Sequence, residues 1–251
     1  MTSRSAIEWT EMTWNPVTGC DRVSPGCENC YAQTLARRLK AMGNPRYQKD
    51  GRTRTSGPGF GVTMHWDKLQ EPLARRKPTM FFVNSMSDLF HDHVSVAFID
   101  RVFETMAATP RHTYQVLTKR PRRMASFTTD RGIPDNVWLG TSVENQEWSE
   151  RRVPLLLQVQ ARVRFLSCEP LLGPVDLSPW ISDLSWVIVG GESGPKHRQM
   201  EVSWVRSIRD QCLAAGVPFF FKQWGGRTPK AGGRILDHRS WDDMPSAEGA
   251  R

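Results

Sequence analysis

Seven short runs of β-branched and aromatic residues recur along this chain, and stretches of helical character separate most of them. The runs cover residues 61–66, 79–85, 112–118, 136–142, 162–168, 185–191 and 218–224. A further run at 12–18 brings the predicted strands to eight. The main predicted helices cover residues 30–43, 95–109, 146–158 and 201–215. This alternation favours parallel strands joined by crossover helices.

Eight such units in 251 residues predict an α/β fold, namely a complete or partial (β/α) barrel of mostly parallel strands. We expect a single domain over residues 1–251, and the pattern leaves a doubly wound open sheet as the alternative. No apolar run reaches the roughly 18 residues of a membrane span. The opening "MTSRSAIEWTEMTW" has no apolar segment typical of a secretory signal, so we expect a cytoplasmic protein.

Polar residues follow nearly every predicted strand. Because the carboxyl ends of parallel strands meet at one face, we expect these residues to form one shared site. They are Asn84, Asp88, Thr118, Lys119, Ser142, Glu144, Cys168, Glu169, Gly190, Gly191, Glu192, Lys222 and Gln223. Their chemistry makes Glu144, Glu169, Glu192 and Lys119 the candidate catalytic residues.

Three cysteines, spaced C-x6-C-x2-C, lie between the first predicted strand and the helix at 30–43. A structural zinc site takes four protein ligands, but the first histidine, His65, belongs to another unit. In a [4Fe–4S] cluster, three cysteines leave one iron open to a non-protein ligand. We therefore predict that Cys20, Cys27 and Cys30 bind an iron–sulfur cluster, with the thiols kept reduced in the cell.

Several other features allow two interpretations. Cys168 is either a fourth cluster ligand or a buried small residue, whereas Cys212 is expected in the core. The segment "DLFHDH" (88–93) is either a second metal site or a solvated loop. The segment "GGESG" (190–194) is either an anion-binding nest or a tight turn that requires glycine.

Motifs along nearly the whole chain resemble a phage-associated three-cysteine family of uncharacterised proteins that is considered radical-SAM-like. The motifs are "TWNPVTGCDRVSPGCENCYA", "VLTKRP", "GTSVEN", "SCEPLLG", "VGGESG" and "FFKQWG". The radical S-adenosylmethionine (SAM) superfamily usually has C-x3-C-x2-C followed by an aromatic residue. This chain keeps C-x2-C and the aromatic residue, Tyr31, but has six residues in the first gap.

The resemblance implies that the open iron binds SAM, whose reductive cleavage yields a 5′-deoxyadenosyl radical. It also implies that Tyr31 flanks the cofactor. The superfamily's "GGE" element, which binds the methionine amino group, follows the second strand, whereas Gly190, Gly191 and Glu192 follow the seventh predicted strand here. The expected cofactor-binding residues are therefore Tyr31, the strand-end residues Asn84 and Ser142, and Gly190, Gly191 and Glu192.

A net charge of +8 favours a polyanionic partner such as DNA or RNA. Basic residues after predicted strands should form a positive rim: Lys119, Arg120, Arg122, Arg123, Lys196 and Arg198. We expect a basic flap or a disordered insertion at 44–61, and a glycine-rich tail at 225–251 that wraps the mouth and ends in frayed residues. Tryptophans near the motifs could stack on bases. They are Trp9, Trp14 and Trp224.

The leading hypothesis is therefore a radical-SAM-like iron–sulfur enzyme that acts on a polyanionic, nucleic-acid-like substrate. One alternative is a metal-stabilised nucleic-acid-binding protein without SAM chemistry. Another is a barrel hydrolase in which the cysteines hold structural zinc. A protein partner is compatible with all three.

Overall fold

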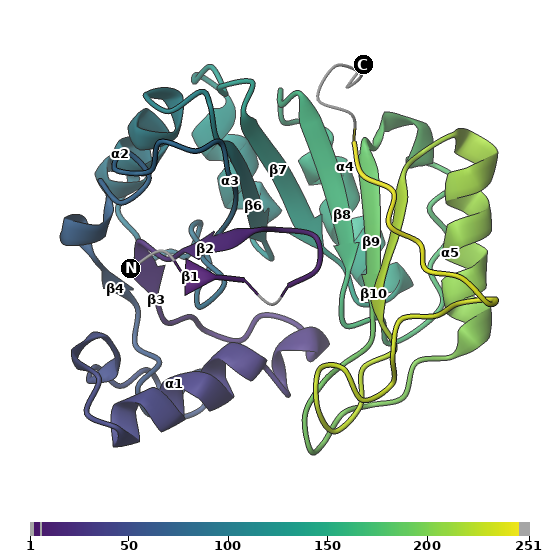
Figure 1. Ribbon diagram of the computed structural model, residues 1–251, viewed down its shortest axis with the longest axis horizontal. Coiled ribbons are helices and arrows are strands. Elements are labelled where there is room, and N and C mark those ends of the chain that lie inside the picture. The colour runs from purple at the N-terminus through teal and green to yellow at the C-terminus, as the bar shows by residue number, and fades with distance from the viewer. Residues whose placement is uncertain (1–2, 6, 246–251) are drawn as a thin grey trace.

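A curled sheet of eight strands dominates the computed structural model, which describes residues 3–5 and 7–245 (Figure 1). Seven strands are parallel and follow one another in chain order. They are β2 (Met12–Trp14), β5 (Met80–Val83), β6 (Thr113–Thr118), β7 (Val137–Ser142), β8 (Val163–Cys168), β9 (Trp186–Gly190) and β10 (Phe219–Gln223). The short β1 (Ser3–Arg4) runs antiparallel to β2 at one edge. Because β1 and β10 are the two edges, the barrel is partial, and the strand order excludes a doubly wound sheet.

The outside of this curled sheet is covered by α2 (Val96–Ala107), α3 (Pro121–Thr128), α4 (Gln146–Leu156) and α5 (Val202–Ala215) (Figure 1). Helix α1 (Tyr31–Ala41) packs instead against the 44–61 segment. The sequence analysis predicted all of them except α3, whose basic start was interpreted only as part of the positive rim. Pro121 at the first helical position is the signal that was available. None of the helices in the described part of the chain is long and apolar enough to cross a membrane.

The predicted strands at 12–18 and 61–66 do not both join the barrel. The first divides at Pro16, which has no N–H group for a sheet ladder, into β2 and β3 (Val17–Thr18). The second contributes only β4 (Thr63–Met64), which pairs antiparallel with β3 in a separate small sheet. Seven of the eight predicted strands thus form the parallel part of the barrel sheet. Its remaining strand is β1, an antiparallel edge strand beside β2 that the sequence analysis did not predict.

Both faces of the barrel sheet are buried, which is why its strands read as nearly continuous apolar runs. Alternate residues face opposite sides, so Phe81 and Val83 pack against the helices while Phe82 faces inward. The inner face of the sheet carries an aromatic cluster around Trp186. The ring centroid of Trp186 lies 6.1 Å from that of Trp138. Trp14 is fully buried in the outer core, so it is not available for base stacking.

The 44–61 segment, for which we expected a flap or a disordered insertion, is packed, and so is the described part of the glycine-rich tail. In the 44–61 segment, Tyr47 and Phe60 are buried against α1. In the tail, Trp241 packs on Phe219, and its carbonyl accepts the Phe221 N–H at 2.9 Å along the edge of β10. The last residues of the tail, 246–251, lie outside the described residues.

A glycine at the end of β9 allows the chain after β10 to approach closely. A Cβ atom at Gly191 would lie 2.0 Å from the carbonyl oxygen of Trp224. We therefore expect Gly191→Ala to lower the free energy of unfolding by about 1–3 kcal/mol in urea titrations. Gly132, which has open space around it, is the control, and Gly132→Ala should change this energy by less than about 0.5 kcal/mol. Equal losses in the two variants would contradict the packing argument.

Candidate functional site

A cavity of about 630 Å³ opens where the parallel strands end, between the sheet and the segment that carries the three cysteines. We call residues 19–30 the cysteine loop. The cavity has the size of a small-molecule site. Of the predicted residues it is lined by Cys20, Cys27, Cys30, Tyr31, Asn84, Asp88, Thr118, Lys119, Arg120, Ser142, Glu169, Gly191, Glu192, Lys222 and Gln223. The structure thus brings the cysteines and the strand ends together, as expected.

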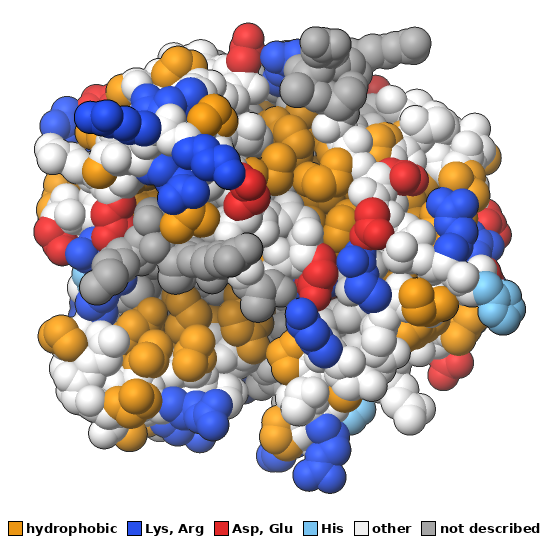
Figure 2. Space-filling model, viewed as in Figure 1, with side chains coloured by type: hydrophobic (Ala, Val, Ile, Leu, Met, Phe, Trp, Pro, Cys, Tyr) orange, Lys and Arg blue, Asp and Glu red, His pale blue; other side chains and the backbone are white. Residues whose placement is uncertain are grey.

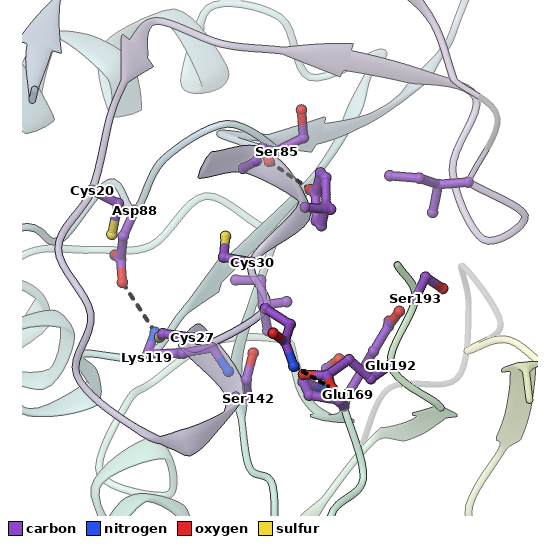
Figure 3. A pocket seen from close by; sticks show the side chains of 18 of the residues that line it. Cys20, Cys27, Cys30, Ser85, Asp88, Lys119, Ser142, Glu169, Glu192 and Ser193 are labelled. Carbon is purple, nitrogen blue, oxygen red and sulfur yellow. Dashed lines mark hydrogen bonds between the residues drawn. The ribbon is translucent and has the colours of Figure 1, made fainter. Parts of the chain in front are cut away.

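The cysteines lie on one side of this cavity and Glu169 and Glu192 on the other (Figure 3). Glu169 forms an ion pair with Lys222, with Oε1 and Nζ 2.6 Å apart. The floor is apolar and belongs to the inner aromatic cluster, with Trp9 and Phe82 among its residues. The cavity therefore joins a thiol-rich wall, a polar wall and an apolar floor.

The cysteine loop has only one turn of regular structure of its own, the 3-10 turn Pro25–Cys27. Contacts from the strand ends hold it, and the first comes from Arg120, just after β6. Arg120 Nη1 donates to Cys20 Sγ at 3.4 Å, and Nη2 donates to the Asp21 carbonyl at 3.1 Å. Asp88 Oδ2, 3.0 Å from Nη1, keeps the guanidinium in this position.

The second contact comes from Glu144, just after β7, whose side chain is completely buried. Glu144 Oε1 accepts from Ser24 Oγ of the cysteine loop at 2.7 Å. Its counter-charges are Lys119 and Arg152, the latter 3.2 Å away. Burial by itself would raise the pKa of Glu144, but these two cations hold the pKa below its usual value. Glu144 is thus ionised and anchors the loop, and it does not line the cavity.

The third contact comes from Glu192, after β9. Glu192 Oε2 accepts from Asn29 Nδ2 of the cysteine loop at 2.9 Å, and Oε1 accepts from Arg198 Nη2 at 2.5 Å. Arg198 also donates to the Pro25 carbonyl at 2.9 Å. Burial would raise the pKa of Glu192, but hydrogen bonds from Arg198 and Asn29 hold it below its usual value.

The segment at 44–61 forms a fourth support rather than the flap that we expected. The Asp21 carboxylate accepts hydrogen bonds from the hydroxyls of Thr55 and Ser56. The Cys20 N–H donates to the Phe60 carbonyl at 3.3 Å, and the Arg22 N–H donates to the Thr55 carbonyl at 3.1 Å. The segment is therefore a fixed wall beside the cysteine loop.

The expected positive rim is largely neutralised, and in this respect the prediction was wrong. Three of its members, Lys119, Arg120 and Arg198, are ion-paired with carboxylates at the same strand ends. Arg123 donates to the backbone carbonyls of His91 and Val94. Basic and acidic side chains are interspersed on the face shown in Figure 2. Of the six predicted cations, only Arg122 and Lys196 are exposed.

The segment "GGESG" does not form an anion-binding nest. The Gly191 N–H donates to the Gln223 carbonyl at 2.9 Å, and the Gly194 N–H donates to the Gly226 carbonyl at 2.8 Å. Gly190 does not line the cavity, and a Cβ there would lie 3.1 Å from the Glu169 carboxyl carbon. Glycine is required in this segment because other parts of the chain pack closely against its backbone.

The alternative metal sites find no support in the described residues. Asp88 accepts from Thr118 Oγ1 at 2.7 Å and from the Lys119 N–H at 3.1 Å, so its oxygens are already used. Burial lowers the pKa of His91, which is hydrogen-bonded to Asp21. In the described part of the chain, no three His, Cys, Asp or Glu side chains are grouped to hold a metal ion.

The two remaining cysteines lie away from the cysteine loop. Cys168 is fully buried in the outer core and does not line the cavity, so the interpretation as a fourth ligand is not supported. Cys212 is fully buried in the same core, as predicted.

The donor set at the cavity fits an iron–sulfur cluster better than a single ion. Ligands of a [4Fe–4S] cluster sit at separate corners of a cube, so three thiols along one cavity wall suit it. Burial raises the pKa of Cys20 to about 12 and also raises that of Cys30, so metal binding would release thiol protons. Trp9 and Asn84 both line the cavity, and Trp9 Nε1 and Asn84 Nδ2 have no hydrogen-bond acceptor among the described residues.

The sequence did not reveal two residues that support the cysteine loop. Asn29 was overlooked because polar residues in a loop are ordinary. Arg152, which the sequence analysis did not single out, lies on the buried face of α4 with Val153 and Leu156. A charge on the apolar face of a helix is the signal that would have indicated a buried ion pair.

Fold and site together define a partial (β/α) barrel with a three-cysteine loop at the mouth of its cavity. Residues 4–245 match the model of the family described as "Protein of unknown function (DUF5131)", and the chain belongs to this family. The phage association implied by the resemblance stays a prediction. A search of curated protein sequences found no match.

Solved structures with a similar fold include several of spore photoproduct lyase. A cysteine-to-serine mutant of that protein superposes with a TM-score of 0.52 at 14% identity. A double mutant with bound AdoMet and dinucleoside spore photoproduct gives 0.51 at 13% identity. Each match covers 84% of this chain and 63% of the other, so this chain spans less than two thirds of those proteins. The similarity confirms the fold.

Loss of the Glu144 carboxylate should destabilise the fold strongly, because it leaves Lys119 and Arg152 without their buried counter-charge. We expect Glu144→Gln to lower the free energy of unfolding at pH 7 by about 3–5 kcal/mol in urea titrations. The control is Glu147→Gln, which removes an exposed ion pair with Arg151 and should cost less than about 1 kcal/mol. A loss in Glu144→Gln no larger than that of the control would contradict the anchoring role.

The same carboxylate predicts a pH dependence. The lowered pKa of Glu144 means that its ionised form stabilises the folded protein above its ordinary pKa of about 4.5. This stabilisation is lost as the pH falls through the lower folded-state value. Unfolding free energies measured between pH 7 and pH 3 should therefore fall below about pH 4.5, and less steeply in Glu144→Gln.

Proposed function

We propose that this protein is an iron–sulfur enzyme of the radical SAM type, in which a three-cysteine [4Fe–4S] cluster acts with S-adenosylmethionine. The observation that carries the proposal is the convergence of three thiols from one loop and the polar strand ends on a single cavity. The similarity to spore photoproduct lyase, one structure of which holds AdoMet, supports it.

Cys20, Cys27 and Cys30 would each bind one iron and leave the fourth iron open to SAM. When bound, the cluster supplies the electron for reductive cleavage of SAM. The apolar floor formed with Trp9 and Phe82 would exclude water from that side of the cavity, which would protect a reactive species from side reactions.

The residues that would bind the methionine end of SAM differ from those that the resemblance implied. Both oxygens of Glu192 are occupied by Arg198 and Asn29. Glu169 and Lys222, in contrast, line the cavity as a pair of opposite charges. Such a pair suits a zwitterion, whose amino group would be attracted to Glu169 and whose carboxylate would be attracted to Lys222. Tyr31, Asn84 and Ser142 remain candidates for contacts to the rest of the cofactor.

The test is anaerobic purification or reconstitution followed by analysis of iron, sulfide and zinc. We expect about four irons and four sulfides per chain, and loss of the cluster in Cys20→Ala, Cys27→Ala or Cys30→Ala, because these thiols share one cavity. Cys168→Ala and Cys212→Ala are matched controls, since both cysteines are buried in the core. Zinc without sulfide, or a full cluster in Cys27→Ala, would contradict the proposal.

We further propose that the substrate contains nucleotides, since the net charge is +8 and a similar structure holds a dinucleoside spore photoproduct. Because most strand-end cations are internally paired, phosphate contacts would fall to the exposed ones, Arg122 and Lys196. A nucleic acid held mainly by such contacts binds less tightly as salt increases.

Salt titrations of binding to duplex DNA, single-stranded DNA and RNA test this proposal. Arg122→Ala and Lys196→Ala should each reduce the salt slope by about 1, since each removes one phosphate contact. Lys77→Ala is the control, because Lys77 is exposed but precedes β5 at the opposite end of the barrel. Binding weaker than about 10⁻⁴ M at physiological salt for all three nucleic acids would exclude a nucleic-acid substrate.

A further inference from the structure

Arg120 is a largely buried cation that lines the cavity and contacts one of the three cysteines. Its side chain is only 11% exposed, and Nη1 lies 3.4 Å from Cys20 Sγ. The other guanidinium nitrogen, Nη2, donates to the Asp21 carbonyl at 3.1 Å. A group that is buried and already bonded in this way is poorly placed to reach a phosphate in solution.

Asp88 holds this guanidinium rigidly. Its Oδ2 lies 3.0 Å from Arg120 Nη1 and also accepts the Lys119 N–H at 3.1 Å. Its Oδ1 accepts from Thr118 Oγ1 at 2.7 Å and from the Phe90 N–H at 2.9 Å. With four donors on one carboxylate, Asp88 has little freedom, so the position of Arg120 relative to Cys20 is defined by the fold.

This arrangement depends on the planar, forked shape of the arginine guanidinium group. Two of its nitrogens engage three acceptors at once, namely Cys20, Asp88 and the Asp21 carbonyl. A lysine ammonium is a single point charge and cannot reproduce this planar geometry. The contact to sulfur is therefore a specific one, made by a group whose charge is permanent.

We propose that Arg120 and Asp88 together set the reduction potential of the iron–sulfur cluster, Arg120 through its charged hydrogen bond to the Cys20 sulfur and Asp88 as the opposing charge. This inference rests on the proposed iron–sulfur function. Reduction adds a negative charge to the cluster, and potentials respond to net charge and to hydrogen bonds at the ligating sulfurs. The cation favours the reduced cluster and raises the potential, whereas the carboxylate lowers it. Both are positioning residues that act on the cluster through Cys20.

The experiment measures the midpoint potential of the anaerobically reconstituted full-length protein by spectroelectrochemistry, together with iron and sulfide content. The variants are Arg120→Gln, Arg120→Lys and Asp88→Asn. Arg122→Gln is the matched control, since Arg122 lies two residues further on, is exposed and does not line the cavity.

We expect the midpoint potential to shift in opposite directions in the Arg120 and Asp88 variants. Arg120→Gln should make the potential more negative, Asp88→Asn should make it more positive, and Arg120→Lys should lie between Arg120→Gln and the wild type. Arg122→Gln should leave the potential unchanged. A purely structural role would not produce shifts of opposite sign in two neighbouring groups.

An unchanged potential in Arg120→Gln with full cluster content would overturn the inference and leave the proposed function intact. If Arg120→Gln does not bind a cluster, Asp88→Asn tests the inference instead. A midpoint potential in Asp88→Asn that is unchanged or more negative than in the wild type would also overturn it. Absence of iron and sulfide in the wild type would instead refute the proposed function, so the two failures can be told apart.

Discussion

Ion pairs made by buried carboxylates at the ends of the parallel strands determine where the cysteine loop lies. The loop has a single 3-10 turn and no strand or helix that could order it alone. Asp88 with Arg120, Glu144 with Arg152, and Glu192 with Arg198 each join a different strand end to it. A charge removed from water must be paired, and the cost of leaving one partner alone exceeds the gain from the pair. Such contacts therefore contribute more to a unique loop position than to overall stability.

The fold was predictable from the sequence because it depends on local patterns. Apolar runs separated by helical stretches identified the parallel strands of the barrel. The predictions that were wrong also concern local features of the chain. The first predicted strand ends before Pro16, earlier than expected. The helix α3 was not predicted because its first residues are basic. The convergence of strand ends on one cavity followed from topology alone, since parallel strands share their carboxyl ends.

The partners of the polar residues could not be predicted, because they come from distant parts of the chain. Ser24 and Glu144 are 120 residues apart, and Asn29 and Glu192 are 163 residues apart. From the sequence, we predicted Glu144 as a candidate catalytic residue and Arg120 as part of a positive rim for nucleic acid. Only their placement shows that the first is sealed from the cavity and that the second contacts a thiol. Strand-end position identifies the region of a site but does not distinguish a reacting group from a supporting one.

An open barrel has two sheet edges, and each is a template to which another chain could add a strand. At one edge β1 is only two residues long, which offers little backbone for pairing. At the other, Asp242 forms an antiparallel bridge with Phe220, and the buried Trp241 fastens the tail alongside β10. Thr228 to Lys230 of the same tail line the cavity. The glycine-rich tail thus both completes the cavity wall and occupies part of the β10 edge, where the strand of another chain would otherwise pair.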